Sequence, residues 1–283
     1  DQGITGLGLT REMEDALKCS GIDYVIYDKT NPNPTTDNVE EALGLYHAEH
    51  CEGIIGFGGG SAMDCAKGVA IRVARPNTSL QQVKGILKVW VKLPLLIAVP
   101  TTAGTGSEPT LTSVIVDSKT RHKYAINDFP LIPRYAVLDP KVTRALPPLI
   151  TATTGLEALT HAVEAYIGRS TTPGTRKDAL WAVKLIFGNL NQAYFHGDDL
   201  KARRKMLMGS FYAGAAFTKS YVGYVHAIAH SLGGEYNVPH GLANAVILPM
   251  MLRSYGPCIH KKLKRLAIAA GLCDHRMPED QAA

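Results

Sequence analysis

The chain has 283 residues, of which 46% are hydrophobic and 19% are charged, and its formal net charge is +5. This is the composition of an ordinary folded protein, and it excludes an intrinsically disordered chain. At about 150 residues per domain, the length predicts two domains.

The sequence shows no sign of a membrane or nucleic-acid partner. No apolar run approaches the ~18 residues of a membrane-spanning helix, and the chain opens with Asp1-Gln2-Gly3 rather than with a secretion signal. The densest basic cluster, at residues 261–265, is typical of the solvated face of an amphipathic helix. The five cysteines are widely spaced and lack a Cys-x-x-Cys motif. They therefore predict no disulfide framework and no cysteine-ligated zinc, and they favour a reducing, cytoplasmic location.

Before about residue 140, strand-like runs alternate with helical stretches. Helices are expected at residues 9–20, 37–49 and about 61–73, the second with Asp37 and Glu40 at the spacing of a capping box. Strands are expected at residues 24–27, 53–57, 95–99, 113–117 and 135–138. Short strands that alternate with helices predict a mostly parallel sheet covered by helices.

The pattern changes beyond residue 140, where the strand signals stop. Apolar residues recur at helical spacing at Leu159, Ala162, Val163 and Tyr166, and again in residues 179–190 and 203–216. Prolines interrupt the pattern between residues 139 and 148. We therefore expect an α/β domain over residues 1–140 and an all-helical domain over residues 141–283. An inter-domain cleft is a favoured place for a ligand.

A glycine-rich run, Gly58-Gly59-Gly60-Ser61, follows an expected buried strand and opens an expected helix. Glycines let the backbone approach a ligand closely, and the free N–H groups and dipole at a helix start favour an anion. The run thus predicts a pyrophosphate site, although it is neither Gly-x-Gly-x-x-Gly nor a P-loop. A plain strand-to-helix turn is the alternative.

A second polar segment, Thr-Thr-Ala-Gly-Thr-Gly-Ser-Glu at residues 101–108, follows the strand expected at 95–99. It lies at the carboxyl end of a parallel strand, which is where open α/β sheets bind ligands. Its hydroxyls and glycines suit contacts to a sugar phosphate, and an ordinary Thr/Ser-rich loop is the alternative. Two such loops at one sheet edge favour a nucleotide.

Histidines and one carboxylate recur at helical spacing in the second half. Glu157 and His161 are four residues apart, as are His226 and His230, and His240 follows at an expected helix start. Imidazoles with a carboxylate can hold iron, zinc or manganese, with a position left open for catalysis. Glu157 and His161 alone could instead be a simple helix-face pair. The other three histidines lie in an apolar stretch, where unpaired imidazoles would be costly, and this favours a site.

Together these motifs resemble the iron-containing (group III) alcohol dehydrogenases, nearest the branch with lactaldehyde reductase and 1,3-propanediol dehydrogenase. The match is in order over nearly the whole chain. It is carried by Gly58-Gly59-Gly60-Ser61-x-x-Asp64, by residues 100–108, by Gly-Leu-Glu-Ala-Leu-Thr-His-Ala-Val-Glu-Ala-Tyr at 155–166, and by His226-Ala-Ile-Ala-His230 with Pro239-His240-Gly241.

The resemblance implies an N-terminal α/β dinucleotide-binding domain followed by an all-α metal-binding domain, a dehydroquinate synthase-like fold. It implies a metal-dependent transfer of hydride between NAD(H) and a small primary alcohol, diol or aldehyde. The implied metal is Fe²⁺, with Zn²⁺ as the alternative, and the implied assembly is a homo-oligomer, a dimer or larger. The implied partner is a small molecule, with no nucleic acid and no membrane.

The resemblance also implies roles for individual residues. Asp1 matches an acidic residue that bonds the adenosine ribose, which favours NAD over NADP because a carboxylate repels a 2′-phosphate. His230 matches a catalytic, proton-relaying histidine near the nicotinamide. The implied metal ligands are Glu157, His161, His226 and His240. The implied cofactor contacts are Asp1, Asn33, Gly59, Gly60, Ser61, Thr101, Thr102, Thr105 and Lys123.

Two features depart from the family pattern. Glu157 stands where the family usually has Asp, and the chain is expected to be short at both ends. These departures support a catalytically impaired relative that only binds nucleotide, although the other motif positions are retained. A metallohydrolase with the same histidines is a further alternative. It is weaker, because His226-Ala-Ile-Ala-His230 lacks the Glu of His-Glu-x-x-His and because both phosphate-type loops would have no role.

Overall fold

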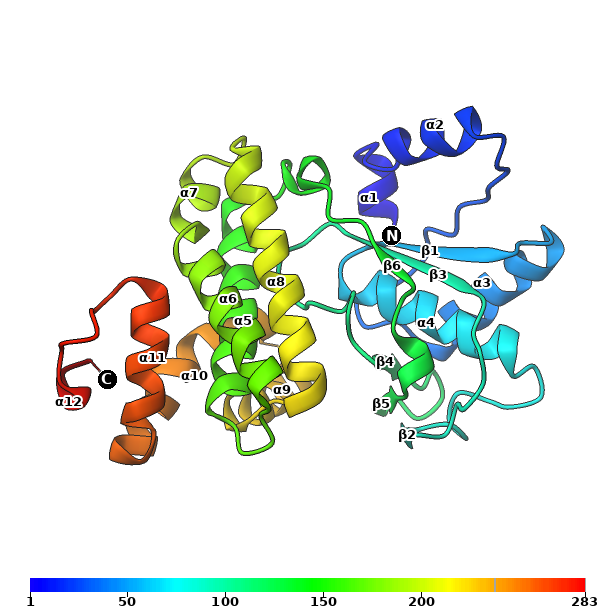
Figure 1. The fold of residues 1–283 in the computed structure, drawn as a ribbon. Helices are drawn as coiled ribbons and strands as arrows, with labels where there is room; N and C mark the ends of the chain where they lie inside the picture. The colour runs from blue at the N-terminus through cyan, green and yellow to red at the C-terminus, as the bar shows by residue number, and fades with distance from the viewer. Residues whose placement is uncertain (237, 283) are drawn as a thin grey trace. The chain divides into compact units, whose positions relative to one another are not determined.

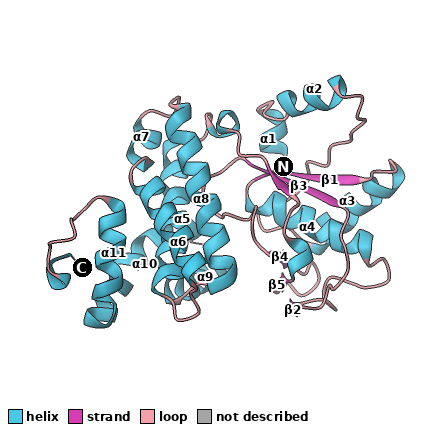
Figure 2. Ribbon diagram, in the orientation of Figure 1, coloured by secondary structure: helices cyan, strands magenta, loops and turns pink. Residues whose placement is uncertain are grey.

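The computed structural model describes residues 1–236 and 238–282, which divide into two compact units. The first unit consists of Asp1–Thr101 and Ser107–Val137, and the second consists of Thr102–Gly106 and the chain from Leu138 onward. Figures 1 and 2 show the helices and strands of each unit. The segment Thr102–Gly106 belongs with the second unit, although it lies well before the boundary expected from the sequence.

A parallel sheet forms one layer of the first unit. Its strands are β1 (Gly53–Gly58), β3 (Leu95–Pro100) and β6 (Tyr135–Ala136), in the order β1-β3-β6. Helix α4 (Gly60–Ala74) follows β1 directly and packs on β1 and β3, and α3 (Thr36–Ala48) packs on α4. This β-α-β arrangement is the one that the alternating pattern predicts.

A second sheet in the same unit contains β2 (Gly85–Ile86), β5 (Lys123–Asn127) and β4 (Thr112–Val116), in the order β2-β5-β4. Here β4 and β5 are antiparallel, because the short connection between them turns at Asp117, whose Oδ1 accepts hydrogen bonds from two following N–H groups. In the described part of the chain, three of the four strand pairings are parallel, as expected.

The N-terminal segment contains α1 (Gln2–Gly6) and α2 (Arg11–Cys19). The strand expected at residues 24–27 is not formed, so this prediction is wrong. The hydroxyls of Tyr24 and Tyr27 instead donate to Glu14 and Glu41 on the neighbouring helices. Between these tyrosines, Val25 and Ile26 are each 39% exposed.

The capping box of α3 differs from the expected pair, Asp37 and Glu40. The hydroxyl of Thr35 accepts from the Asn38 N–H, and the Asn38 side-chain oxygen accepts from the Thr35 N–H. The helix begins at Thr36, so Thr35 is the N-cap residue, and only Asn38 then stands three residues beyond it.

The second unit is helical, with no strand among its described residues. Its centre is α5 (Pro148–Ile167), α6 (Pro173–Phe187) and α8 (Leu200–Ser220), which pack on one another (Figure 1). The remaining elements are η2 (Pro140–Thr143), α7 (Leu190–Phe195), α9 (Tyr224–Tyr236), α10 (His240–Tyr255), η3 (Gly256–Ile259), α11 (His260–Ala270) and α12 (Glu279–Ala282).

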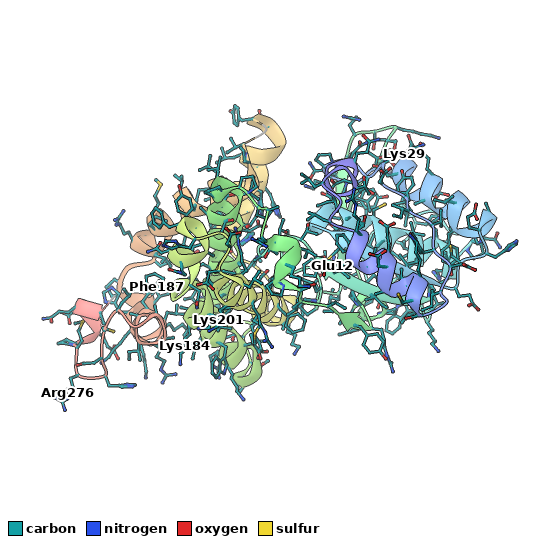
Figure 3. All side chains as sticks on the ribbon, turned by 90° about the horizontal axis from the view of Figure 1, so that it is seen from above. Glu12, Lys29, Lys184, Phe187, Lys201 and Arg276 are labelled. Atoms are coloured by element: carbon teal, nitrogen blue, oxygen red, sulfur yellow. The ribbon has the colours of Figure 1, made fainter. Side chains whose placement is uncertain are left out.

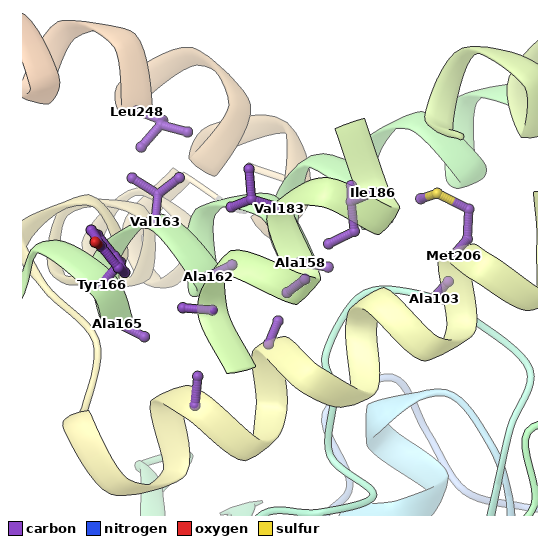
Figure 4. Packing of buried hydrophobic residues seen from close by; sticks show 14 of the residues in the cluster. Ala103, Ala158, Ala162, Val163, Ala165, Tyr166, Val183, Ile186, Met206 and Leu248 are labelled. Carbon is purple, nitrogen blue, oxygen red and sulfur yellow. The ribbon is translucent and has the colours of Figure 1, made fainter. Parts of the chain in front are cut away.

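Small residues let these helices approach closely. Ala158 and Ala162 of α5 are fully buried in the core shown in Figure 4. A Cβ added at Gly209 of α8 would lie only 2.6 Å from the Ile186 Cγ1 on α6. Because the helix backbones are this close, polar side chains from neighbouring helices of the second unit can contact one another.

The surface of the second unit carries charged residues such as Lys184 and Lys201, together with the 44% exposed Phe187 (Figure 3). None of the described helices combines the length and the apolar character needed to cross a membrane. The five cysteines are present as free thiols.

A buried charge ties α4 to the chain that follows the threonine-rich loop. Lys67 is fully buried, and its ammonium group donates to oxygens of Ser107, Thr110 and Thr112 at 2.8–3.2 Å. Burial lowers the pKa of Lys67, and the carboxylates of Asp64 and Glu108 oppose this shift. The lysine thus holds the segment after the loop in place.

Glu108 is also buried, but its carboxyl group has fewer hydrogen-bond partners than the ammonium group of Lys67. It is 2% exposed, and its Oε2 has no hydrogen-bond partner. Burial raises the pKa of Glu108 from 4.5 to about 7, against the attraction of Lys67. The folded state therefore binds the proton more tightly than the unfolded state does, so stability is lost as the pH rises from about 4.5 to about 7.

Replacing Glu108 by Gln removes the charge that becomes costly at high pH. We expect Glu108→Gln to raise the free energy of unfolding at pH 8 by about 1–3 kcal/mol and to change it little at pH 4.5. Denaturant unfolding at the two pH values measures the difference. Glu49→Gln, at an exposed position, is the matched control. Equal or lower stability of Glu108→Gln at pH 8 would show that the buried carboxylate carries no such cost.

Candidate functional site

The two loops that the sequence singles out leave the same edge of the parallel sheet. Strands β1 and β3 are in register, with Gly58 beside Pro100, so both end at one level. The Thr101 N–H donates to the Gly58 carbonyl at 3.0 Å. The expectation that the glycine-rich and threonine-rich loops begin at one sheet edge is therefore confirmed.

The glycine-rich loop leaves the start of α4 open. Gly59 is the N-cap residue and has no side chain to cap the first N–H groups, which together with the helix dipole can receive an anion. Gly58 has φ +147°, and a Cβ there would lie 2.7 Å from the Ala62 Cβ. Only glycine fits this position without displacing the helix start.

Three of the expected cofactor contacts meet at this helix start. The Asn33 N–H donates to the Ser61 hydroxyl at 3.2 Å, and the Lys123 ammonium donates to the Asn33 Oδ1 at 2.6 Å. Asn33 has φ 58°, a conformation that Asn tolerates better than most residues. Burial lowers the pKa of Lys123, and Asp64 opposes the shift. The structure thus places an amide, a hydroxyl and an amine together beside the open helix end.

The remaining expected cofactor contacts are Asp1 and three threonines of the segment after β3. Asp1 is exposed, and its carboxylate accepts from the Ile4 N–H at 3.1 Å, which caps α1. Thr101 is buried in the first unit, whereas Thr102 and Thr105 are half-buried members of the second unit.

The segment Thr102–Gly106 packs tightly within the second unit. A Cβ at Gly104 would lie 2.6 Å from the Thr154 Cβ on α5, and a Cβ at Gly106, which has φ +55°, would lie 2.6 Å from the Ser210 carbonyl on α8. The glycines of this loop therefore serve helix packing, a role that the sequence analysis did not assign to them.

The histidines and Glu157 come together in the second unit. Glu157 and His161 lie on α5, His226 and His230 on α9, and His240 is the first residue of α10. The rings of His161 and His226 are stacked with centroids 4.3 Å apart. The His240 ring is 5.5 Å from that of His226 and 5.0 Å from that of His230. Glu157 Oε1 is 3.9 Å from His240 Nε2.

Three residues of the cluster are buried, and two of them have ring nitrogens that lack partners. Glu157, His161 and His226 are 7%, 6% and 2% exposed. His161 Nδ1 and His226 Nε2 are buried without a hydrogen-bond partner. Leaving such atoms unpaired is expensive, and a bound cation would satisfy both. The donor set of imidazoles and one carboxylate suits a divalent first-row metal.

The side chains do not yet converge on one point. Among residues 1–236 and 238–282, no three His, Cys, Asp or Glu side chains are arranged to hold a metal ion as they stand. Binding a cation therefore requires side-chain rotation within the cluster. The metal-ligand roles of Glu157, His161, His226 and His240 remain predictions.

The electrostatics favour a neutral imidazole at His161. Burial, with the nearby His226 and His240, holds the pKa of His161 well below its usual value of 6.5, so its ring keeps a lone pair for a cation. Burial raises the pKa of Glu157 to about 7. A cation would favour the ionised form of that carboxyl group.

Glu164 was missed by the sequence analysis as a site residue. Its Oε2 lies 2.5 Å from Nδ1 of His226, and the residue is 4% exposed. Glu157, His161 and Glu164 follow one another at spacings of four and three, which places them on one face of α5. That spacing was a signal in the sequence that could have identified Glu164 as a site residue.

Two family models match the chain. The model described as iron-containing alcohol dehydrogenase matches residues 1–140, and the model described as Fe-containing alcohol dehydrogenase family, C-terminal, matches residues 151–283. The chain is 45% identical over 255 residues to 1,3-propanediol dehydrogenase of Citrobacter freundii, which covers 89% of this chain and 66% of that protein. It thus spans slightly less than two thirds of the length of this relative.

Comparison with solved structures points to the same family. The crystal structure of a 1,3-propanediol oxidoreductase superposes with a TM-score of 0.95 at 38% identity, over 100% of this chain and 74% of that one. Sulfoacetaldehyde reductase from Bifidobacterium kashiwanohense in complex with NAD⁺ gives a TM-score of 0.86 at 31% identity, over 96% and 72% of the two chains. The chain therefore belongs to the iron-containing alcohol dehydrogenase family.

Proposed function

We propose that this chain is an NAD-dependent, iron-type alcohol dehydrogenase that interconverts a small primary alcohol or diol and its aldehyde. The observation that carries the proposal is the cluster of Glu157 and four histidines, in which buried His161 and His226 each have a ring nitrogen that lacks a partner. Family membership and the relatives named for 1,3-propanediol support the reaction class.

In this proposal Glu157, His161, His226 and His240 hold Fe²⁺, with Zn²⁺ as the alternative. When bound, the cation polarises the oxygen of the substrate, and NAD accepts or supplies the hydride. His230 is exposed and its ring lies 5.0 Å from that of His240. A histidine placed in this way can take a proton at its ring and pass it to water.

The dinucleotide is proposed to bind at the start of α4. The uncapped N–H groups of Gly60 and Ser61 suit a pyrophosphate, and Asn33 and Lys123 contribute polar groups beside it. Thr101, Thr102 and Thr105 complete the proposed contacts. We propose that Asp1, whose carboxylate caps α1 in this structure, bonds the adenosine ribose of the bound cofactor, which favours NAD over NADP. A relative solved in complex with NAD⁺ supports the same choice.

The assembly and location are also part of the proposal. Free thiols agree with a reducing, cytoplasmic environment, and we propose a homo-oligomer of two or more chains. The two alternative functions are less well supported. A metallohydrolase leaves the open start of α4 without a role, and an inactive relative leaves the two unpartnered buried nitrogens without a reason.

The direct test loads the purified protein with Fe²⁺ under anaerobic conditions and follows NADH formation with propane-1,3-diol and a panel of short primary alcohols. We expect turnover that a chelator abolishes and that Fe²⁺ or Zn²⁺ restores. If metal and NAD both bind but no substrate is turned over, the chain is a binding-only relative and the proposed activity is wrong.

Replacing His226 by Ala removes a proposed ligand that is 2% exposed. We expect His226→Ala to weaken Fe²⁺ binding by at least ~100-fold, because one of few ligands is lost, and to leave NADH binding within about twofold. Metal analysis and NADH fluorescence titration measure the two effects. His47→Ala, at an exposed position, is the control. An unchanged metal content would remove His226 from the ligand set.

Replacing Gly58 by Ala tests the glycine-rich loop. The added Cβ would lie 2.7 Å from Ala62 at a φ of +147°, so the start of α4 must shift. We expect NADH affinity to fall more than tenfold while Fe²⁺ affinity is unchanged. Gly44→Ala, where a Cβ meets nothing within 4 Å, is the matched control. Unaltered NADH affinity in a folded Gly58→Ala protein would mean that the pyrophosphate binds elsewhere.

Glu157 is the ligand at which this chain departs from its relatives. The longer side chain moves the carboxylate outward, and a displacement of about 1 Å in a catalytic centre can cost ~100-fold in rate. We therefore expect Glu157→Asp to raise metal retention or turnover, whereas Glu157→Gln lowers both. Metal content and NADH formation are measured for both variants. A metal-replete, fully active Glu157→Gln protein would exclude Glu157 as a ligand.

A further inference from the structure

Glu164 makes three hydrogen bonds inside the second unit. Its Oε2 accepts from the Gly223 N–H at 2.9 Å and lies 2.5 Å from His226 Nδ1. Its Oε1 accepts from the Val225 N–H at 2.8 Å. The side chain is 2% exposed, so water does not compete for these contacts.

These contacts fix which ring nitrogen of His226 carries hydrogen. A backbone N–H can only donate, so both oxygens of Glu164 act as acceptors, as they do in a carboxylate. His226 Nδ1 must then be the donor. In a neutral ring the lone pair lies on Nε2, and this is the buried nitrogen that has no partner.

The same carboxylate holds the helix that carries His226. The Val225 N–H belongs to the first turn of α9, where backbone donors have no partner within the helix. By accepting it, Glu164 on α5 fixes the start of α9 next to its own helix. The ring of His226 is further held by its stacking on His161, at an interplanar angle of 15°.

We propose that Glu164 is a positioning residue for the metal centre, which orients the His226 ring and presents its Nε2 to a divalent cation. This inference rests on the proposed function, because it assumes that His226 is a ligand. Carboxylates that hydrogen-bond a ligating histidine raise its basicity, and their loss typically costs 10–100-fold in metal affinity.

A purely structural role would give different results. If Glu164 only caps α9, its removal lowers the melting temperature of the metal-free protein and leaves the metal centre unchanged. The test therefore measures the centre itself. Co²⁺ serves as the probe, because its visible absorption bands report ligand geometry and chelator competition gives its affinity.

Glu164→Gln keeps the size of the side chain but replaces one acceptor oxygen by a donor NH₂. That group must face either the Val225 N–H or the hydrogen of His226. We expect Co²⁺ affinity to fall 10–100-fold and the Co²⁺ bands to shift, at temperatures well below the melting transition. Glu235→Gln, at an exposed position on α9, is the control.

Gly223→Ala tests the same contact without removing a charge. An added Cβ would lie 2.6 Å from Glu164 Oε1, so the carboxylate must move. We expect a lower Co²⁺ affinity than in Gly234→Ala, the matched control on α9, where a Cβ meets nothing within 4 Å. The Glu164→Gln/Gly223→Ala double variant should lose less than the sum of the two single losses, because both act on one contact.

The outcomes separate the inference from the proposed function. Wild-type Co²⁺ affinity and bands in a folded Glu164→Gln protein overturn the positioning role and leave the metal site intact. If the unaltered chain binds neither Co²⁺ nor Fe²⁺, the proposed metal site and the role of Glu164 both fail. Weaker binding and shifted bands in Glu164→Gln and Gly223→Ala, with both controls unchanged, support the inference.

Discussion

The main physical constraint on the second unit is that two imidazole nitrogens are buried without hydrogen-bond partners. His161 Nδ1 and His226 Nε2 lie in a helical core whose other buried residues are mostly small and apolar. Leaving such an atom without a hydrogen bond costs of order 1–3 kcal/mol for each. Close packing creates this cost, because the small residues of α5 bring three helices near enough for their polar side chains to meet.

The first unit also buries a charged group, but here the group has hydrogen-bond partners. Lys67 is fully buried, yet each of its hydrogen-bonding directions is used by oxygens of residues 107–112. The result is a rigid connection from α4 to the chain beyond the threonine-rich loop. The start of α4, in contrast, is left uncapped at Gly59. Rigidity beside an open helix end is what a site for a phosphate requires, since the N–H groups must already point the right way.

The sequence predicted the features that depend on near neighbours in the chain. The turn at Gly58–Gly60, the change to a helical unit and the position of His226 and His230 on one helix all follow from residues that are close together in the sequence. The failures have two causes. Residues 24–27 have the composition of a strand, but their side chains contact neighbouring helices. The capping box of α3 is local, but its position depends on the residue at which the helix begins. Glu164 and His226 are 62 residues apart, so spacing could suggest the face of α5 but not the contact.

Burial also divides the histidine cluster into a fixed and an adjustable part. His226 is 2% exposed and is held on both sides, by the carboxylate of Glu164 and by the ring of His161. The side chain of His240 is 35% exposed and lies at the first residue of its helix. Ordering a long or exposed side chain costs entropy, whereas a ring already locked in place costs little more on binding. In the proposed metal site, rotation toward a common cation would therefore fall mainly on His240, the most exposed of the four proposed ligands. In that proposed site, the stacked rings of His161 and His226 would define the position of the cation, and His240 would move toward it.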